Sequence, residues 1–206
     1  MTHLRPQIVA AASTPAEQTA VDSTGTRGRL PRLGRFLVLS VFVVGLWAVA
    51  SPAAATVDRP ASPMRPLEQS VLAQLNALRR QHGLVSLRIS FDLAAAARQH
   101  SAEMASRGYF GHNSASGLSF DRRIARLYPR NNHRYWSVGE NLLWSSRELN
   151  AAAALNIWLN SPKHRKTMLM TRWREVGVGA VQVGSAPGVF GGREVTIVTA
   201  DFGVRR

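Results

Sequence analysis

Two histidines and one glutamate stand in local settings that could support chemistry. His112 lies in Tyr109-Phe-Gly-His-Asn-Ser114, Glu140 lies in Val138-Gly-Glu-Asn-Leu142, and His164 follows Trp158-Leu-Asn-Ser-Pro-Lys. Two imidazoles and one carboxylate can bind a divalent metal with open positions, or can act as acid and base. Their spacing matches no short metal motif, and a solitary histidine is often a hydrogen-bonded structural group. From the residues alone, a functional site and a structural role for these residues both stay open.

Ser161 is a potential nucleophile three residues before His164. However, Ser-Pro is also typical of a helix start, with serine as the N-cap and proline at the first helical position, and we favour that interpretation. The chain has no cysteine, so disulfides, thiolate metal sites and cysteine nucleophiles are excluded.

Hydrophobic periodicity predicts the elements that must position these residues. We expect helices over residues 67–82 and 91–108, a short helix that holds Ile124 and Leu127, and a helix over 148–159. Strands are expected over 135–143, 176–183 and 195–202, the last two as an antiparallel pair. The charged face of the first helix should be solvated, His100 should be packed on the second helix, and Asn141 should fix a local turn. Helices around an antiparallel sheet define an α+β fold.

The first part of the chain has the order of an export signal. Residues 1–35 are expected to be a disordered basic tail that ends in several arginines, and the run over 36–50 is uncharged. Ser51-Pro-Ala-Ala-Ala55 follows as a small-residue cleavage site, so residues 36–55 are predicted to be a secretory signal peptide or, alternatively, a membrane anchor. Residues 56–66 hold three prolines and are predicted to be a linker. Residues 56–206 should therefore lie on the outer side of the cytoplasmic membrane.

The chain is strongly basic, with 26 Lys and Arg against 12 Asp and Glu and a net charge of +14. Five of the arginines and two of the acids lie in residues 1–55, so the part predicted to be exported carries about +11. The arginines are scattered along the chain rather than gathered in one basic helix, which argues against nucleic acid as the partner. Anionic lipids or cell-wall polymers fit this charge better.

Four of these segments, taken in order, resemble the motifs of the CAP superfamily, the cysteine-rich secretory, antigen 5 and pathogenesis-related proteins, in its bacterial branch. They are Phe110-Gly-His112, Gly139-Glu-Asn-Leu142, Trp158-x-x-Ser161-Pro-x-His164-Arg and Val176-Gly-Val-Gly179. The resemblance implies a CAP (SCP) domain over residues 67–203, folded as a three-layer α-β-α sandwich with a small antiparallel sheet.

The resemblance also implies a ligand cleft that contains His112, Glu140, His164 and Ser161. In several family members such a cleft binds zinc or another divalent cation, and the corresponding metal ligands here would be His112, His164 and Glu140. The family's second acid is missing, because Ser161 stands where relatives carry a glutamate.

Three functions follow as expectations. The first is a secreted or membrane-tethered protein that binds a lipid, a peptide or a cell-wall component in the cleft, favoured because no convincing nucleophile is present. The second is a metal-dependent, peptidase-like hydrolase in which Glu140 acts as the base. The third is a surface protein whose basic face docks on anionic polymers and whose cleft is vestigial. The ligand and the oligomeric state are not predicted.

Overall fold

The computed structural model describes residues 65–146 and 149–206. The predicted tail, the signal or anchor segment over 36–55 and most of the linker lie outside these residues. None of the helices in the two described ranges combines the length and the hydrophobicity that a membrane span requires.

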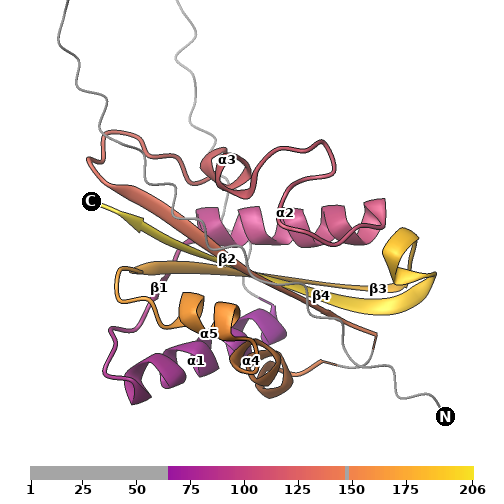
Figure 1. The fold of residues 1–206 in the computed structure, drawn as a ribbon, viewed down its shortest axis with the longest axis horizontal. Helices are drawn as coiled ribbons and strands as arrows, with labels where there is room; N and C mark the ends of the chain where they lie inside the picture. Colours follow the sequence, from indigo (N-terminus) through magenta and orange to yellow (C-terminus); the bar gives the residue numbers. More distant parts are fainter. Residues whose placement is uncertain (1–64, 147–148) are drawn as a thin grey trace, which may run out of the picture. The chain divides into compact units, whose positions relative to one another are not determined.

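The described residues form three layers (Figure 1). Helices α2 (Phe91–Arg107) and α3 (Phe120–Ala125) cover one face of the sheet, while α1 (Pro66–Gln81), α4 (Ala151–Leu159) and α5 (Pro162–Met168) cover the other. The strands are β1 (Arg88–Ile89), β2 (Trp136–Ser145), β3 (Glu175–Ala186) and β4 (Arg193–Arg205), and a short 3-10 helix (Gly188–Phe190) joins the last two. This is the α-β-α sandwich that the sequence predicted.

The sheet has the order β1-β3-β4-β2. β4 pairs antiparallel with both β2 and β3, as expected for the last two strands, but β1 pairs parallel with β3. The sheet is therefore mixed, and the expectation of a purely antiparallel sheet is wrong in this detail. A strand of two residues leaves no hydrophobic alternation that a sequence pattern could detect.

Local signals placed most helix boundaries well. Ser90 accepts a hydrogen bond from Leu93 N at 3.3 Å, and Gly108 ends α2 in the left-handed conformation at φ 71°. In contrast, α3 ends at Ala125, so Leu127 lies outside it, and α4 begins after Asn150, whose side chain accepts from Ala153 N. A cap that satisfies a free backbone N–H thus sets the start of α4, three residues after the predicted one.

The charged face of α1 is not fully solvated, contrary to the prediction. Glu68 is completely buried and accepts hydrogen bonds from Arg98 Nε at 2.9 Å and from Ala180 N at 3.1 Å. Because β1 is so short, Ala180 lies on an otherwise unpaired edge of β3, and Glu68 satisfies that edge. Arg79 is also buried and donates to the carbonyl of Met168 at 2.6 Å.

The motif Val176-Gly-Val-Gly179 lets α2 lie directly on the sheet. A Cβ at Gly177 would stand 2.0 Å from Ala94 N, and one at Gly179 would stand 2.2 Å from Arg98 N. No side chain fits at either position, so the two glycines set the close approach of helix and strand.

Candidate functional site

Adjacent residues of β2 point to opposite faces of the sheet, and this separates the predicted site residues. The Glu140 side chain lies on the α2–α3 face, where it contacts His112 and Arg123. The side chain of Asn141 lies on the other face and donates to the carbonyl of His164 at 3.1 Å. Asn141 therefore bridges two elements 23 residues apart in sequence, and the prediction that it fixes a local turn is wrong.

Glu140 lies at the centre of a buried charge cluster. Its Oε1 lies 2.7 Å from His112 Nδ1, and its Oε2 accepts a close hydrogen bond from the guanidinium of Arg123. Arg123 also lies 3.8 Å from Asp201 Oδ2 and donates to the carbonyl of Ala96. Glu140 and Asp201 are 0% exposed, and the side chain of His112 retains 11% exposure. His112 is thus the member of this cluster that reaches furthest toward solvent.

Four separate segments bring this charge cluster together. The register of β2 and β4 places Asp201 directly opposite Glu140, so their side chains share one face. Arg123 comes from α3, which is short but anchored through buried Phe120 and Ile124. His112 lies in the loop after α2.

His100 supports that loop from α2. It is buried, as predicted, and its Nε2 lies 2.9 Å from the carbonyl oxygen of Gly111. An N–H must donate to a carbonyl, so the proton is on Nε2. Burial lowers the pKa of His100, with Glu140 and Arg123 acting in opposite directions. His100 is therefore a neutral positioning residue beside His112.

The two carboxyl groups respond to this environment in opposite directions. Burial alone would raise the pKa of Glu140, but the charge of Arg123 and the hydrogen bond from His112 lower it to about 2. Burial raises the pKa of Asp201 well above its usual value, and the neighbouring charge of Glu140 adds to this while Arg123 opposes it. Glu140 is accordingly the stronger acid of the two and Asp201 the weaker one.

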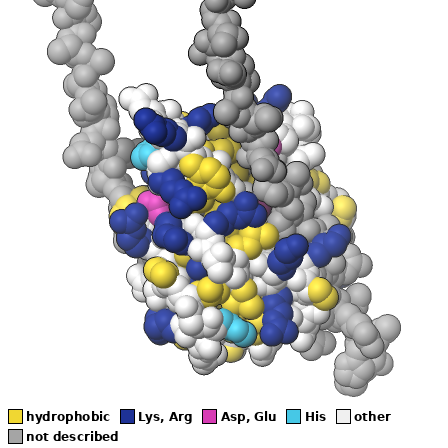
Figure 2. All heavy atoms as spheres, turned by 60° about the vertical axis from the view of Figure 1, so that its left-hand side comes forward, with side chains coloured by type: hydrophobic (Ala, Val, Ile, Leu, Met, Phe, Trp, Pro, Cys, Tyr) yellow, Lys and Arg dark blue, Asp and Glu magenta, His cyan; other side chains and the backbone are white. Residues whose placement is uncertain are grey.

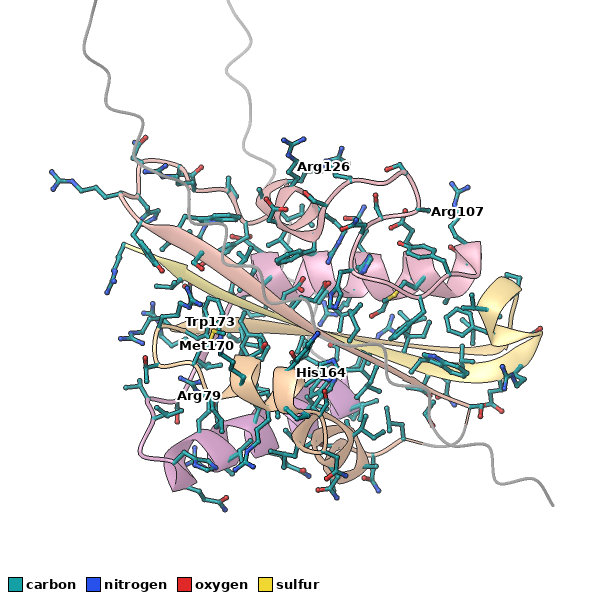
Figure 3. The ribbon with its side chains drawn as sticks, in the orientation of Figure 1. Arg79, Arg107, Arg126, His164, Met170 and Trp173 are labelled. Carbon is teal, nitrogen blue, oxygen red and sulfur yellow. The ribbon has the colours of Figure 1, made fainter. Side chains whose placement is uncertain are left out.

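The predicted metal set of His112, His164 and Glu140 does not fit a metal in this arrangement. Both Glu140 oxygens and the Nδ1 of His112 are already in contact with each other or with Arg123. His164 is buried in α5, in the layer on the other side of the sheet from α2 and α3 (Figure 3). In the described ranges, no group of three or more His, Asp or Glu side chains could hold a metal ion. A guanidinium occupies the position beside Glu140 where a cation would bind.

Ser161 is the N-cap residue of α5, with Pro162 at the first helical position, as predicted. Its carbonyl oxygen accepts from Arg165 N at 2.9 Å, although its side chain makes no capping hydrogen bond. Ser161 thus belongs to the α5 layer with His164, while His112 and Glu140 belong to the α2–α3 face.

Sequence reasoning missed Arg123 and Asp201. Arg123 is one of many scattered arginines, and nothing in its spacing distinguishes it from exposed Arg122. Asp201 did carry a signal, because it is an acid within the β-rich run over 195–202 where neighbouring residues are apolar. A charged residue in a buried strand needs a partner, and here that partner is Arg123.

The sequence model described as "Cysteine-rich secretory protein family" (CAP) matches residues 72–202. The chain belongs to the CAP family. Among curated relatives it is 31% identical over 139 residues to "Uncharacterized protein YkwD" of Bacillus subtilis, covering 67% of this chain and 51% of that protein. It is also 31% identical over 112 residues to "Uncharacterized membrane protein YlbC" of B. subtilis, covering 54% of this chain and 31% of that protein.

A similar solved structure is an extracellular protein containing a SCP domain from Bacillus anthracis. It shares 26% sequence identity with a TM-score of 0.52, and the match covers 70% of this chain and 45% of that one. The chain therefore spans between about a third and about half of the length of these proteins. The family and the fold agree with the resemblance stated from the motifs.

Proposed function

We propose that this CAP-family chain is a secreted or membrane-tethered binding protein that holds the acyl chain of a lipid of the cell envelope. Export is supported by the arginine-flanked apolar segment before residue 56. It is also supported by similarity to a protein described as extracellular and to another named as a membrane protein.

The observation that carries the lipid proposal is a groove of about 240 Å³ between α1 and α4. Its apolar residues are Ala77, Leu78, Ala152, Leu155 and Leu159, and the amide side chains of Gln74, Gln81 and Asn156 complete the lining. Small-molecule sites typically measure about 300–1,000 Å³ and combine apolar walls with a few polar groups. The groove is smaller than this range, so it suits part of one alkyl chain better than a ring system.

The chemistry of the charge cluster weighs against the alternative of a metal-dependent hydrolase. A general base must reach the proton it removes, but the carboxylate of Glu140 is fully buried and ion-paired with Arg123. We therefore assign Glu140 a structural role that fixes the orientation of His112.

Palmitate binding, measured by isothermal titration calorimetry, tests the lipid proposal. The change Ala152→Trp, on the α4 side, should fill the groove and weaken binding at least ten-fold. Ala102→Trp is the matched control, because Ala102 is likewise an exposed alanine on a helix, but on α2, on the other side of the sheet. The proposal fails if the wild-type protein binds no palmitate, or if Ala152→Trp binds it as tightly as the control.

A further inference from the structure

One end of the sheet gathers positive charge from segments far apart in the sequence. The register pairs Arg88 with Glu175, Glu175 with Gly203, and Trp136 with Arg205. The starts of β1, β2 and β3 therefore meet the end of β4. We call this region the basic end, and its arginines are Arg88, Arg130, Arg134, Arg172, Arg174, Arg205 and Arg206. Figure 2 turns this side forward and shows Lys and Arg side chains spread over it.

Aromatic rings hold several of these guanidinium groups in place. Arg205 lies over Tyr128 at 3.8 Å, Arg206 over Tyr135 at 4.9 Å, and Arg172 over its neighbour Trp173 at 5.0 Å. A guanidinium that stacks on a ring keeps its N–H groups directed outward in the plane. That fork matches the oxygens of a phosphate group, and holding it in place reduces the entropy lost on binding.

Acidic residues neutralise only part of this charge. Glu175 lies 3.7 Å from Arg88 and 3.9 Å from Arg205, and Asp92 lies 3.5 Å from Arg205. In the part of the chain that the structure describes, Arg134 and Arg206 have no carboxylate within salt-bridge distance. The basic end therefore keeps a positive surplus for an anionic partner.

Exposed apolar side chains lie among these arginines. Phe91 is 50% exposed and directly precedes Asp92, the ion-pair partner of Arg205. Leu127 is 39% exposed and directly precedes Tyr128, on which Arg205 stacks. Hydrophobic side chains also lie between the arginines in Figure 2. Basic residues combined with exposed apolar ones are typical of surfaces that lie on a membrane, since a charged polymer offers no apolar phase.

We propose that the basic end docks on a membrane surface that contains anionic phospholipids. The arginines bind the phosphate groups, and Phe91 and Leu127 enter the interface between headgroups and acyl chains. This docking is independent of the α1–α4 groove, so either proposal can fail without the other.

Co-sedimentation of the full chain with vesicles tests the docking. The readout is the ratio of binding to phosphatidylglycerol-containing vesicles over binding to pure phosphatidylcholine vesicles, because the apolar segment over 36–50 would contribute to both. Each basic residue near an anionic surface is worth about five-fold in binding. The double change Arg134→Gln/Arg206→Gln should therefore lower the ratio at least ten-fold, and wild-type binding should weaken as salt rises.

The matched control is Arg107→Gln/Arg193→Gln. Arg193 begins β4, at the strand end opposite Arg205, and stacks on Trp144 at 5.3 Å much as Arg206 stacks on Tyr135. Arg107 ends α2 and lies far from Trp173, which marks the basic end (Figure 3). This control should keep the wild-type ratio. If the first double variant unfolds, as judged by circular dichroism, Arg88→Gln/Arg130→Gln replaces it.

Two results would overturn the proposal. In one, the basic-end variant keeps the wild-type ratio, as the control does. In the other, Phe91→Ser/Leu127→Ser binds the anionic vesicles as well as the wild type, and the wild type binds soluble poly(glycerol phosphate) equally tightly. That second outcome would identify a cell-wall polymer as the partner instead of a membrane.

Discussion

The change Arg123→Met should remove the cation from the buried charge cluster while nearly keeping the side-chain volume. Arg123 contacts Glu140 directly, lies 3.8 Å from Asp201, and is itself only 8% exposed. At an effective dielectric constant of about 20, two unit charges about 4 Å apart interact with about 4 kcal/mol. Breaking one partner of a buried ion pair typically costs about 3–5 kcal/mol. We therefore expect a loss of about 4 kcal/mol in the free energy of unfolding.

The loss of stability in Arg123→Met should also depend on pH, and the buried carboxyl group of Glu140 determines the direction of that dependence. In the wild type the pKa of Glu140 is lowered to about 2, so its stabilising contribution is present above its ordinary value of 4.5 and is lost as pH falls below it. Without Arg123, burial dominates and raises the pKa of Glu140 above 4.5. The folded variant then binds more protons than the unfolded chain, so its stability falls as pH rises. The free energy of unfolding of Arg123→Met should therefore be smaller at pH 8 than at pH 5.

Urea unfolding, followed by tryptophan fluorescence at both pH values, measures this loss. With a urea dependence of about 2 kcal/mol/M, the midpoint should fall by about 2 M. Arg122→Met is the matched control, since Arg122 is the exposed neighbour on the same helix, and it should change stability by less than about 0.5 kcal/mol. A cost below about 1 kcal/mol for Arg123→Met, equal at the two pH values, would refute the reasoning.

Three further changes test other contacts. Asp201→Asn mimics the protonated acid. Because the pKa of Asp201 is raised in the folded protein, wild-type stability should fall as pH rises above about 4. In urea unfolding, the variant should therefore gain stability relative to the wild type between pH 5 and pH 8. Gly177→Ala should cost at least about 3 kcal/mol in thermal unfolding, because its Cβ would meet Ala94 N at 2.0 Å; a melting temperature within 2 °C of the wild type would contradict this. Asn141→Ala should cost about 1–2 kcal/mol by the same measurement, since it removes a buried hydrogen bond to the carbonyl of His164, and an unchanged melting temperature would show the bond to be dispensable.

The parts of the fold that sequence reasoning found are those set by neighbouring residues. Ser90 and Gly108 bound α2 through local capping, and the Ser161-Pro162 pair marks the start of α5, with Pro162 at the first helical position. The order of the motifs supplied the family and, with it, the three layers. The parallel strand β1 was missed because two residues carry no periodic signal.

The charge cluster shows why the rest could not be predicted. His112 and Glu140 were selected as one set and do lie 2.7 Å apart, but Arg123 and Asp201 complete the arrangement from α3 and β4. Their contribution depends on strand register and helix placement, which no local pattern encodes. The separation of His164 from Glu140 follows from the alternation of β2, once the helix that covers each face is known.

The claim that Arg123 takes the place of a metal beside Glu140 is tested most directly by titrating zinc into the purified protein and into the His112→Ala/His164→Ala variant. Calorimetry of the two proteins at neutral pH, with metal content measured before titration, gives the number of sites. The arrangement of the charge cluster predicts that the two proteins take up the same small amount of zinc, with no stoichiometric site. One zinc ion per chain in the wild type, lost in the variant, would contradict this account and restore the metal-dependent hydrolase as the leading hypothesis.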